Sequence, residues 1–156
     1  MKILNIDDIH VLTSQRLGRK VVVGGCFDVI HIGHLSFFTQ AKKERDTLIV
    51  LLESDESIGK WKGRNRPIHT QKERAEILSA FSLIDYIVLL PEMKEDQDYD
   101  DLLLYIRPDV IVTTKGDIGI HHKKRQSKLT GSRLVEVPRI SGKSSSEIVK
   151  LLLSEI

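Results

Sequence analysis

The chain has 156 residues, of which 24 are Lys or Arg and 22 are Asp or Glu, with six His and one Cys. A chain of this length buries on the order of 70% of its unfolded surface, so a hydrophobic content of 40% supplies a core without disulfides or a structural metal. One cysteine and the lack of any apolar run near the ~20 residues that span a bilayer exclude disulfide-scaffold, secreted and transmembrane proteins. We expect one cytoplasmic domain over residues 1–156 with no membrane partner.

The formal net charge of +2 is too small to favour nucleic acid as the main partner, because such binding neutralises many phosphates. The charge is nevertheless uneven. Residues 92–101 are strongly acidic and residues 113–133 are strongly basic. Both runs are compatible with a solvated surface, and the basic run is equally compatible with a functional role.

The first elements alternate between buried strands and a helix. Residues 20–24 (KVVVG) form a continuous apolar run typical of a strand buried on both faces, and residues 48–52 form a second. Between them, Leu35, Phe38 and Ala41 repeat at helical spacing. The pattern predicts strand, helix, strand.

The rest of the chain continues this alternation. Thr70 and Glu73 form a capping box that opens a helix reaching Phe81, and Ser144 and Glu147 form another that opens a last helix. The remaining predicted elements are strands at 86–90, 110–113 and 134–137 and a helix at 98–106. The first 15 or so residues and residues 114–133 carry no clear pattern, and we treat residues 1–19 as an extension of a core at 20–156.

Buried strands that alternate with amphipathic helices predict an α/β fold: a single Rossmann-like, doubly wound, five-stranded parallel sheet with helices on both faces. Such sheets bind ligands outside the carboxyl ends of their strands. The loops after Gly24, Leu52, Thr113 and Val137 are therefore expected to share one rim, where functional residues should lie.

The first candidate cluster follows the first strand, in GGCFDVIHIGHL. His31 and His34 are three residues apart, which places both imidazoles on one face at the start of a helix. A helix N-terminus attracts anions, and Gly33 allows a phosphate to approach the backbone. A buried structural pair or half of a zinc site are the alternatives, and a lone cysteine at the wrong spacing argues against zinc.

Two further clusters fall on the same rim. The segment KWKGRNR at 60–66 carries four cations in seven residues, with glycines at Gly59 and Gly63, and resembles a mobile phosphate-binding loop. The segment RISGKSSS at 139–146 brings cations and three serine hydroxyls to the last helix. Solvated loop and simple N-capping are the alternatives, but three phosphate-binding segments on one rim favour a shared site.

These motifs (GCFDVIHIGH, KWKGRNRP, the KER at 72–74 and RISGKSSSEI) resemble those of the cytidylyltransferase-like nucleotidyltransferase family in order and spacing, from about Lys20 to Ile148. The resemblance implies an enzyme of the EC 2.7.7 type. Such an enzyme transfers AMP or CMP from an NTP to a phosphorylated sugar or alcohol and releases pyrophosphate. It also implies Mg²⁺ bound with the NTP, and it suggests a homodimer.

Two groups within the family share features with the chain. Residues 54–78 look most like D-glycero-D-manno-heptose 1-phosphate adenylyltransferases. Arg139 with the following serines is similar to the signature of glycerol-3-phosphate and ethanolamine-phosphate cytidylyltransferases. Residues 113–117 (TTKGD) and Gly24 depart from the heptose enzymes, which carry Lys-Gly-Gly-Asp-Tyr and an asparagine there. ATP and CTP therefore both stay open as donors.

The resemblance also implies roles for single residues. His31 and His34 would bind the β and γ phosphates, Lys62 the α phosphate and Ser145 or Ser146 the triphosphate from the opposite side. Arg74 and Arg139 would bind the nucleotide or orient the loops. The acids Asp28 and Asp85 are candidates either for metal binding or for a structural role, with no certain metal ligand. The other expected contacts are to the nucleotide from Gly25, Cys26, Phe27, Gly33, Gly142 and Ser144 and to the acceptor from Lys60 and Arg66.

Other functions are compatible with parts of the sequence. His31–His34 matches the first signature of class I aminoacyl-tRNA synthetases, but 156 residues leave no room for their other modules. A catalytically silent nucleotide sensor, or a nucleic-acid module built on residues 123–133, is the remaining alternative. The intact histidine pair, Lys62 and the serines argue against a silent protein, and the basic run lacks the aromatic residues that stack on single strands.

Overall fold

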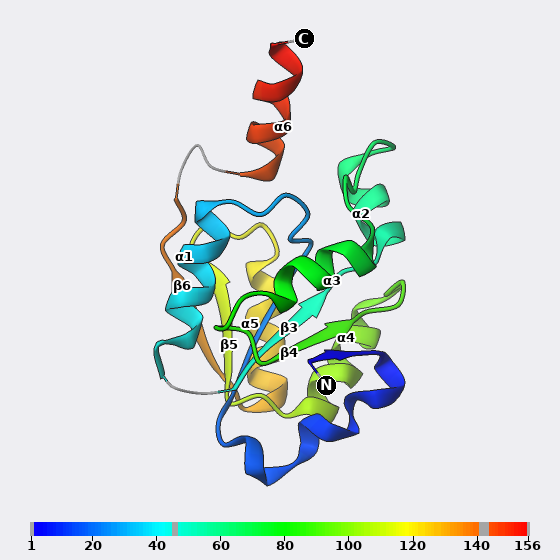
Figure 1. Ribbon diagram of the computed structural model, residues 1–156. Helices are drawn as coiled ribbons and strands as arrows, with labels where there is room; N and C mark the ends of the chain where they lie inside the picture. The colour runs from blue at the N-terminus through cyan, green and yellow to red at the C-terminus, as the bar shows by residue number, and fades with distance from the viewer. Residues whose placement is uncertain (1, 45–46, 141–143, 156) are drawn as a thin grey trace.

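The structure is a computed structural model that describes residues 2–44, 47–140 and 144–155 (Figure 1). One six-stranded, fully parallel sheet in the order β1-β4-β3-β2-β5-β6 organises the molecule. This confirms the predicted fold class. The strands are β1 (Ile3–Leu4), β2 (Lys20–Gly25), β3 (Thr47–Leu52), β4 (Tyr86–Leu89), β5 (Val110–Thr114) and β6 (Arg133–Val137).

Helices cover both faces of the sheet. On one face lie α1 (Ile32–Ala41) and α3 (Gln71–Ser79), and on the other lie the 3₁₀ helix η1 (Ile6–Thr13), α4 (Asp96–Ile106) and α5 (Ile120–Thr130) (Figure 1). Three further elements, η2 (Gln15–Leu17), α2 (Asp55–Lys62) and α6 (Ser145–Ser154), lie at the ends of the sheet, and η3 (Lys42–Glu44) extends α1.

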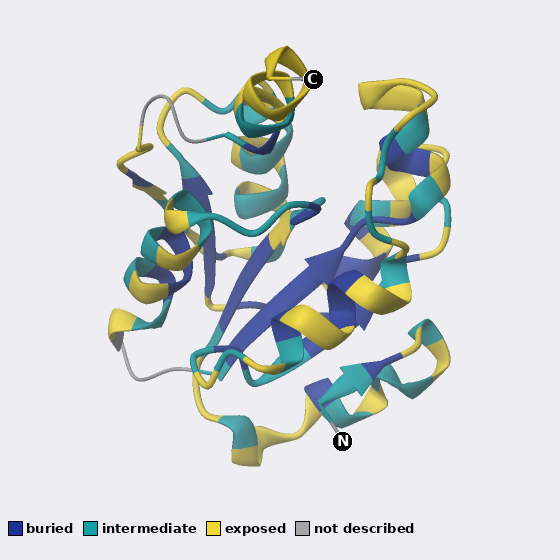
Figure 2. Cartoon of the chain, turned by 45° about the horizontal axis from the view of Figure 1, so that its top comes forward, coloured by how far each residue is buried: buried dark blue, intermediate teal, exposed yellow. Residues whose placement is uncertain are grey.

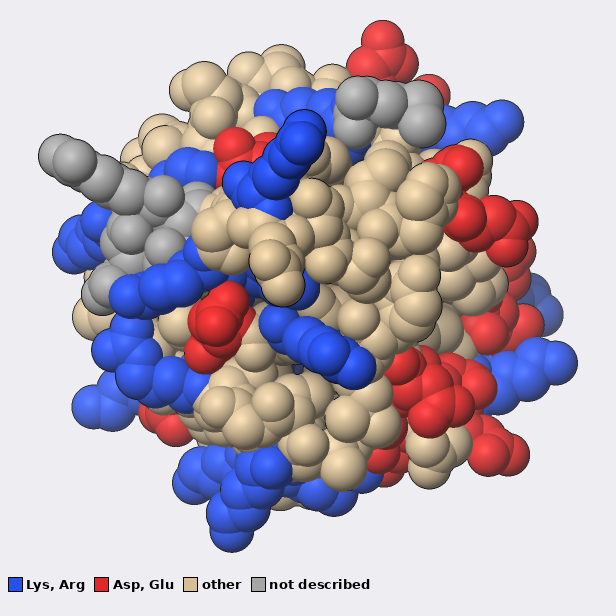
Figure 3. All heavy atoms as spheres, turned by 90° about the horizontal axis from the view of Figure 1, so that it is seen from below, with Lys and Arg blue, Asp and Glu red and all other residues tan. Residues whose placement is uncertain are grey.

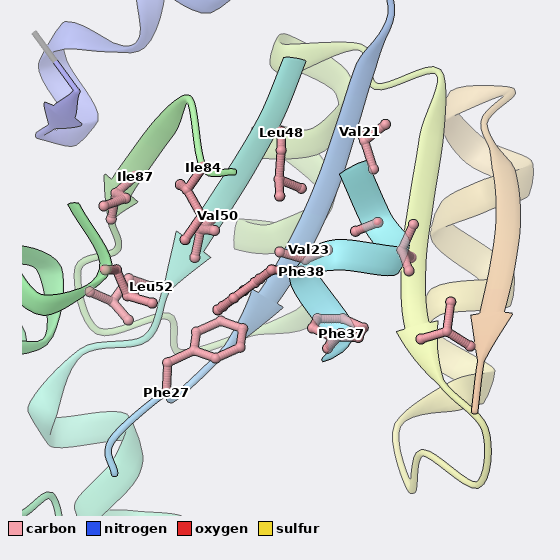
Figure 4. Packing of buried hydrophobic residues seen from close by; sticks show 14 of the residues in the cluster. Val21, Val23, Phe27, Phe37, Phe38, Leu48, Val50, Leu52, Ile84 and Ile87 are labelled. Atoms are coloured by element: carbon pink, nitrogen blue, oxygen red, sulfur yellow. The ribbon is translucent and has the colours of Figure 1, made fainter. Parts of the chain in front are cut away.

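The apolar runs of the strands fill two cores because successive side chains alternate between faces. Val21 and Val23 of β2 pack beneath α1 and α3, whereas Val22 packs beneath α4. Figure 4 shows the first core, where Phe38 lies against Val23 and Phe27 closes the end of the cluster. The central strands are accordingly mostly buried, the edge strand β6 is mostly exposed or half-buried, and the outer faces of the helices are exposed (Figure 2).

The sixth strand is a difference from the predicted five. β1 is two residues long and pairs with the edge of β4, Ile3 beside Ile87, and a strand this short has no periodicity to read. Leu4 and Leu12 are 1% and 0% exposed, so the segment predicted as an extension contributes to the second core.

The helix α5 also escaped the sequence analysis. None of its side chains is buried, so its sequence carries no apolar stripe at helical spacing. It is held instead by polar contacts to its neighbours: Arg125 pairs with Asp100 of α4, and the Ser127 hydroxyl donates to the carbonyl of Ser132.

The strand order creates a crevice at one place. The chain leaves β2 through α1 to β3 and β4 on one side, and α4 then returns it to β5 on the other side of β2. Loops that diverge in this way open a crevice outside the carboxyl ends of β2 and β5, the usual ligand site of doubly wound sheets.

Replacing Leu4 by Ala tests whether the first residues are part of the fold. Because Leu4 is fully buried, we expect a loss of about 2–5 kcal/mol in the free energy of unfolding, measured by urea denaturation. The matched control is Leu153→Ala on α6, where the side chain is 66% exposed and a change within about 0.5 kcal/mol is expected. Equal, small effects of both substitutions would contradict a structural role for β1.

Candidate active site

Two stacked imidazoles mark the beginning of α1. His31 is the N-cap, in extended conformation, and its Nδ1 accepts a hydrogen bond of 3.1 Å from the Gly33 N–H. The ring centroids of His31 and His34 lie 3.8 Å apart, and the ring of Phe27 meets His34 edge-on at 5.3 Å. Since Nδ1 of His31 accepts, its proton is carried by Nε2, which is left as a donor.

Both imidazoles are neutral donors at physiological pH. Burial lowers the pKa of His34 to about 3, with the neighbouring His31 and Lys62 adding to the effect. Burial, Lys62 and Arg139 also lower the pKa of His31. The buried Nδ1 of His34 has no hydrogen-bond partner among the described residues. The pair therefore has ring nitrogens that are not used in hydrogen bonds within the fold.

Cationic groups face a serine hydroxyl beside this pair. Lys62, the last residue of α2, lies 3.5 Å from the Oγ of Ser145, the first residue of α6, and Nη2 of Arg66 lies 3.2 Å from the same oxygen. Ser144 caps α6 in the predicted capping box with Glu147. The N-terminus of α6 therefore adds its positive end to two side-chain cations.

A cavity of about 990 Å³ lies in this crevice. Its size suits a nucleotide together with a second small molecule. Of the predicted nucleotide and catalytic residues, those that line it are Gly25, Cys26, Phe27, His31, Gly33, His34, Lys62, Arg139, Ser144 and Ser145. Gly142 lies outside the described residues, and Ser146 is exposed on α6 and does not line the cavity.

The loop after β2 is built around a close contact. Phe27 adopts a positive φ of 46°, which turns its ring back over Gly25. A Cβ at Gly25 would lie 3.0 Å from two carbons of that ring, so only glycine fits there without a shift. The loop thereby presents its backbone to the cavity, as expected for Gly25, Cys26 and Phe27.

Only part of the KWKGRNR segment is the loop that we predicted. Lys60 and Lys62 belong to α2, which begins with the Ser54 hydroxyl accepting from the Ser57 N–H and is followed by Gly63 with a φ of 99°. These caps, with two acids in the first turn, make residues 60–62 helical, whereas residues 63–66 lie outside any helix. Lys60 pairs with Glu92 and does not line the cavity in this structure, so its contact to the acceptor stays a prediction.

Arg74 orients the loops and does not reach the cavity. The side chain is 0% exposed and donates to the carbonyls of His69, Cys26 and Glu53 and to the carboxylate of Asp55. Of the two roles expected for Arg74, these contacts are those of a residue that orients the loops.

The candidate metal ligands also serve the structure. Asp28 is 1% exposed and accepts from Arg66 Nε and from the N–H groups of Ile68 and His69 at 2.8–2.9 Å. These donors, which outweigh its burial, hold the pKa of Asp28 below its usual value. The side chain of Arg66 is 8% exposed, so it braces Asp28 and Ser145 and is closed to an acceptor.

Asp85 lies at the opposite end of the sheet, where it pairs with Lys42 and accepts from the Leu48 N–H. Within the described residues, no cluster of three or more His, Cys, Asp or Glu could hold a metal ion. In this structure the carboxylates of Asp28 and Asp85 are both engaged by protein donors, which is the structural role of the two that we expected for them.

Several cavity residues were missed by the sequence analysis. Glu53 follows β3 directly, and the Tyr99 hydroxyl donates to both of its carboxylate oxygens at 3.1 and 3.0 Å. On the other wall, Asp117 accepts from Thr113, Gly119 and Lys123. The available signal for Glu53 was its position at a strand's carboxyl end, but nothing in the sequence placed Tyr99 or Lys123 beside it.

Neutral imidazoles, helix N-termini and cations around a crevice at the switch point of a parallel sheet define a nucleotidyltransferase. The chain belongs to the cytidylyltransferase-like family, whose model matches residues 22–151. It is 35% identical over 155 residues to the bifunctional protein HldE of Campylobacter concisus and 38% identical over 156 residues to that of Wolinella succinogenes. Each alignment covers 96% of the chain, which spans about a third of the relatives' length (30% and 31%).

Solved structures show the same fold. The lipopolysaccharide core biosynthesis protein of Thermoplasma volcanium superposes with a TM-score of 0.63 at 23% identity, over 79% of this chain and 98% of that one. The pantoate-beta-alanine ligase of Francisella tularensis superposes with a TM-score of 0.67 at 18% identity, over 96% of this chain and 73% of that one.

The remaining surface bears on other kinds of partner. No helix in the described residues is long and apolar enough to cross a membrane. Acidic side chains gather mostly at one side of the face in Figure 3, and basic ones are spread around the other, so the described surface of that face presents no continuous basic stripe.

Glu53 makes stability depend on pH. Burial raises its pKa from about 4.5 to about 7, against the opposing effects of Tyr99, Lys123 and Arg74, and the Cys26 thiol lies nearby. The folded state thus binds this proton more tightly than the unfolded chain, so the stabilisation from Glu53 is present at low pH and lost as pH rises to about 7. We expect Glu53→Gln to gain up to about 3 kcal/mol relative to wild type between pH 4.5 and pH 8, by urea denaturation. The same difference at both pH values would contradict a raised pKa.

Proposed function

We propose that this domain transfers the adenylyl group of ATP to heptose 1-phosphate, forming ADP-heptose and pyrophosphate. The observation that carries the proposal is the stacked pair His31 and His34, which shares one cavity with Lys62 and Ser145. The family match and the HldE relatives support the reaction class and the choice of substrates.

The reaction needs no general base from the protein. A phosphate monoester has a second pKa of about 6 and is mostly dianionic at pH 7. One of its oxygens attacks the α phosphorus of ATP, and the bond from that phosphorus to the bridging oxygen breaks, so the electron pair leaves with pyrophosphate. The obstacle is the approach of two anions, which positioning and electrostatic stabilisation overcome.

The residues around the cavity fit this requirement. His31 and His34 offer neutral N–H donors to the β and γ phosphates and stabilise the charge that develops on pyrophosphate. Lys62 lies where it can hold the α phosphate, and Ser145 with Ser144 offers the N-terminus of α6 from the opposite side. Arg139 lines the same cavity and adds positive charge near His31.

Magnesium fits as a companion of the NTP and not as a resident ion. The described residues offer no carboxylate cage, and Mg²⁺ commonly binds through phosphate oxygens and water with few protein ligands. When bound, the ion neutralises part of the triphosphate charge. A homodimer stays a prediction of the family resemblance.

Replacing His34 by Asn tests the central role of the pair. We expect kcat for pyrophosphate release from ATP and heptose 1-phosphate to fall about 10²–10³-fold, the usual effect of removing a donor to developing charge. The control is His10→Asn on η1, an exposed residue far from the cavity, which should leave kcat unchanged. A folded His34→Asn protein with the wild-type rate would contradict the assignment.

The choice of substrates is tested with wild-type protein and magnesium. ATP and CTP are each paired with heptose 1-phosphate, glycerol 3-phosphate and ethanolamine phosphate. Turnover is expected only for ATP with heptose 1-phosphate. Turnover with CTP and an alcohol phosphate would replace the proposal by the cytidylyltransferase alternative.

A further inference from the structure

Glu53 differs from the other buried carboxylates near the cavity. It is 7% exposed and lines the cavity. Among the described residues, its hydrogen bonds come from the single proton of the Tyr99 hydroxyl, and no ion pair neutralises it. A carboxylate has about four lone-pair positions, so most of the accepting capacity of Glu53 is unused.

The structural carboxylates of the molecule are treated differently. Asp28 receives two backbone N–H groups and an arginine, and Asp85 receives a lysine and a backbone N–H. A buried charge without such partners is costly. Glu53 therefore lowers the stability of the folded protein. A role in binding a ligand would explain why this carboxylate lies at the edge of the cavity.

The surroundings of Glu53 indicate what kind of group it meets. Beside it the cavity is lined by apolar side chains of both the sheet and α4, Leu51, Leu90, Met93 and Leu103. Lys123 of α5 lines the same cavity and holds Asp117 at 3.2 Å. This part lies on the α4 and α5 side of the sheet, whereas the histidine pair lies at the start of α1 on the other side.

An anionic phosphate is repelled by Glu53, so the triphosphate belongs with His31, Lys62 and Ser145. A carboxylate with unused acceptor positions beside apolar side chains suits a neutral group that carries several hydroxyls. Each hydroxyl can donate to a carboxylate oxygen while its carbon skeleton lies on the apolar side chains. Hydrogen bonds of this kind to an ionised acceptor are the strong ones.

We propose that Glu53 is a specificity-determining residue that accepts hydrogen bonds from the hydroxyl groups of the acceptor sugar, with Tyr99 fixing its orientation. The inference rests on the proposed function for the identity of that acceptor. It goes further in assigning the acceptor's position, between β3, α4 and α5, to residues that the family motifs do not include.

The test measures equilibrium binding of heptose 1-phosphate by calorimetry, without ATP, to wild type and Glu53→Gln at pH 8, where the Glu53 carboxyl is mostly ionised. A purely electrostatic role and a hydroxyl-binding role predict opposite signs. Removing a negative charge strengthens the binding of any anion, whereas losing hydrogen bonds to a charged acceptor weakens the binding of the sugar phosphate. We expect the affinity of Glu53→Gln for heptose 1-phosphate to fall about tenfold or more.

Two controls separate these effects. Inorganic phosphate carries the charge without the sugar, and its affinity is expected to stay equal or rise in Glu53→Gln. Glu56→Gln makes the same chemical change at an exposed position of α2 and should alter neither affinity. Tyr99→Phe keeps the Glu53 carboxylate but removes the hydroxyl that orients it. We expect this variant to bind heptose 1-phosphate more weakly than wild type, by a smaller factor than Glu53→Gln.

Steady-state kinetics give an independent readout. In Glu53→Gln the KM for heptose 1-phosphate should rise while the KM for ATP stays within about twofold. Unchanged or tighter binding of heptose 1-phosphate, or a rise confined to the KM for ATP, would overturn the inference.

The failure of the proposed function has a separate signature. Wild-type protein that binds heptose 1-phosphate through Glu53 but releases no pyrophosphate would refute the reaction and leave the inference standing. Wild-type protein that does not bind heptose 1-phosphate would refute both.

Discussion

The buried guanidinium of Arg74 is the interaction on which the site depends. It joins the loop after β2, the loop after β3 and the beginning of α2 through the Cys26 and Glu53 carbonyls and the Asp55 carboxylate. These are the segments that carry the histidines, the cavity carboxylate and Lys62. A planar group with five donors can hold several acceptors in fixed directions. The spacing between the phosphate-binding and acceptor sides of the cavity is therefore set from within α3.

The histidine pair shows how an anion site is prepared without burying positive charge. His31 uses Nδ1 to cap α1, a position more often occupied by Ser, Thr, Asp or Asn, and keeps Nε2 as a donor. His34 stays neutral because burial and its cationic neighbours lower its pKa to about 3. Donors fixed before the reaction need little reorganisation when charge develops, which is the basis of electrostatic catalysis.

Much of this architecture could be predicted from the sequence, for identifiable reasons. The long apolar strands and the capping boxes at Thr70 and Ser144 gave clear signals because their patterns are local. β1 and α5 did not, since one is two residues long and the other has no buried face. Local sequence patterns predict an element well when its own residues carry the signal. They do not predict an element that is stabilised mainly by contacts with neighbouring elements.

The same distinction holds within the site. His31, His34 and Ser145 were predicted because each sits in a motif, and the structure brings them around one cavity. The partners of the cations could not be predicted: in this structure Arg66 contacts Asp28, Arg74 donates to backbone carbonyls and Lys60 pairs with Glu92. Which positive charges are free for a ligand depends on long-range partners, as does the pairing of Glu53 with Tyr99, separated by 46 positions.

The proposed function requires that the crevice between β2 and β5 bind the triphosphate through the neutral histidine pair. The decisive experiment is a crystal structure with a non-hydrolysable ATP analogue and Mg²⁺. We expect β and γ phosphate oxygens within hydrogen-bond distance of His31 and His34, with Lys62 and Ser145 on the opposite side. A triphosphate bound instead along the basic residues of α5, with both imidazoles free of it, would refute this assignment.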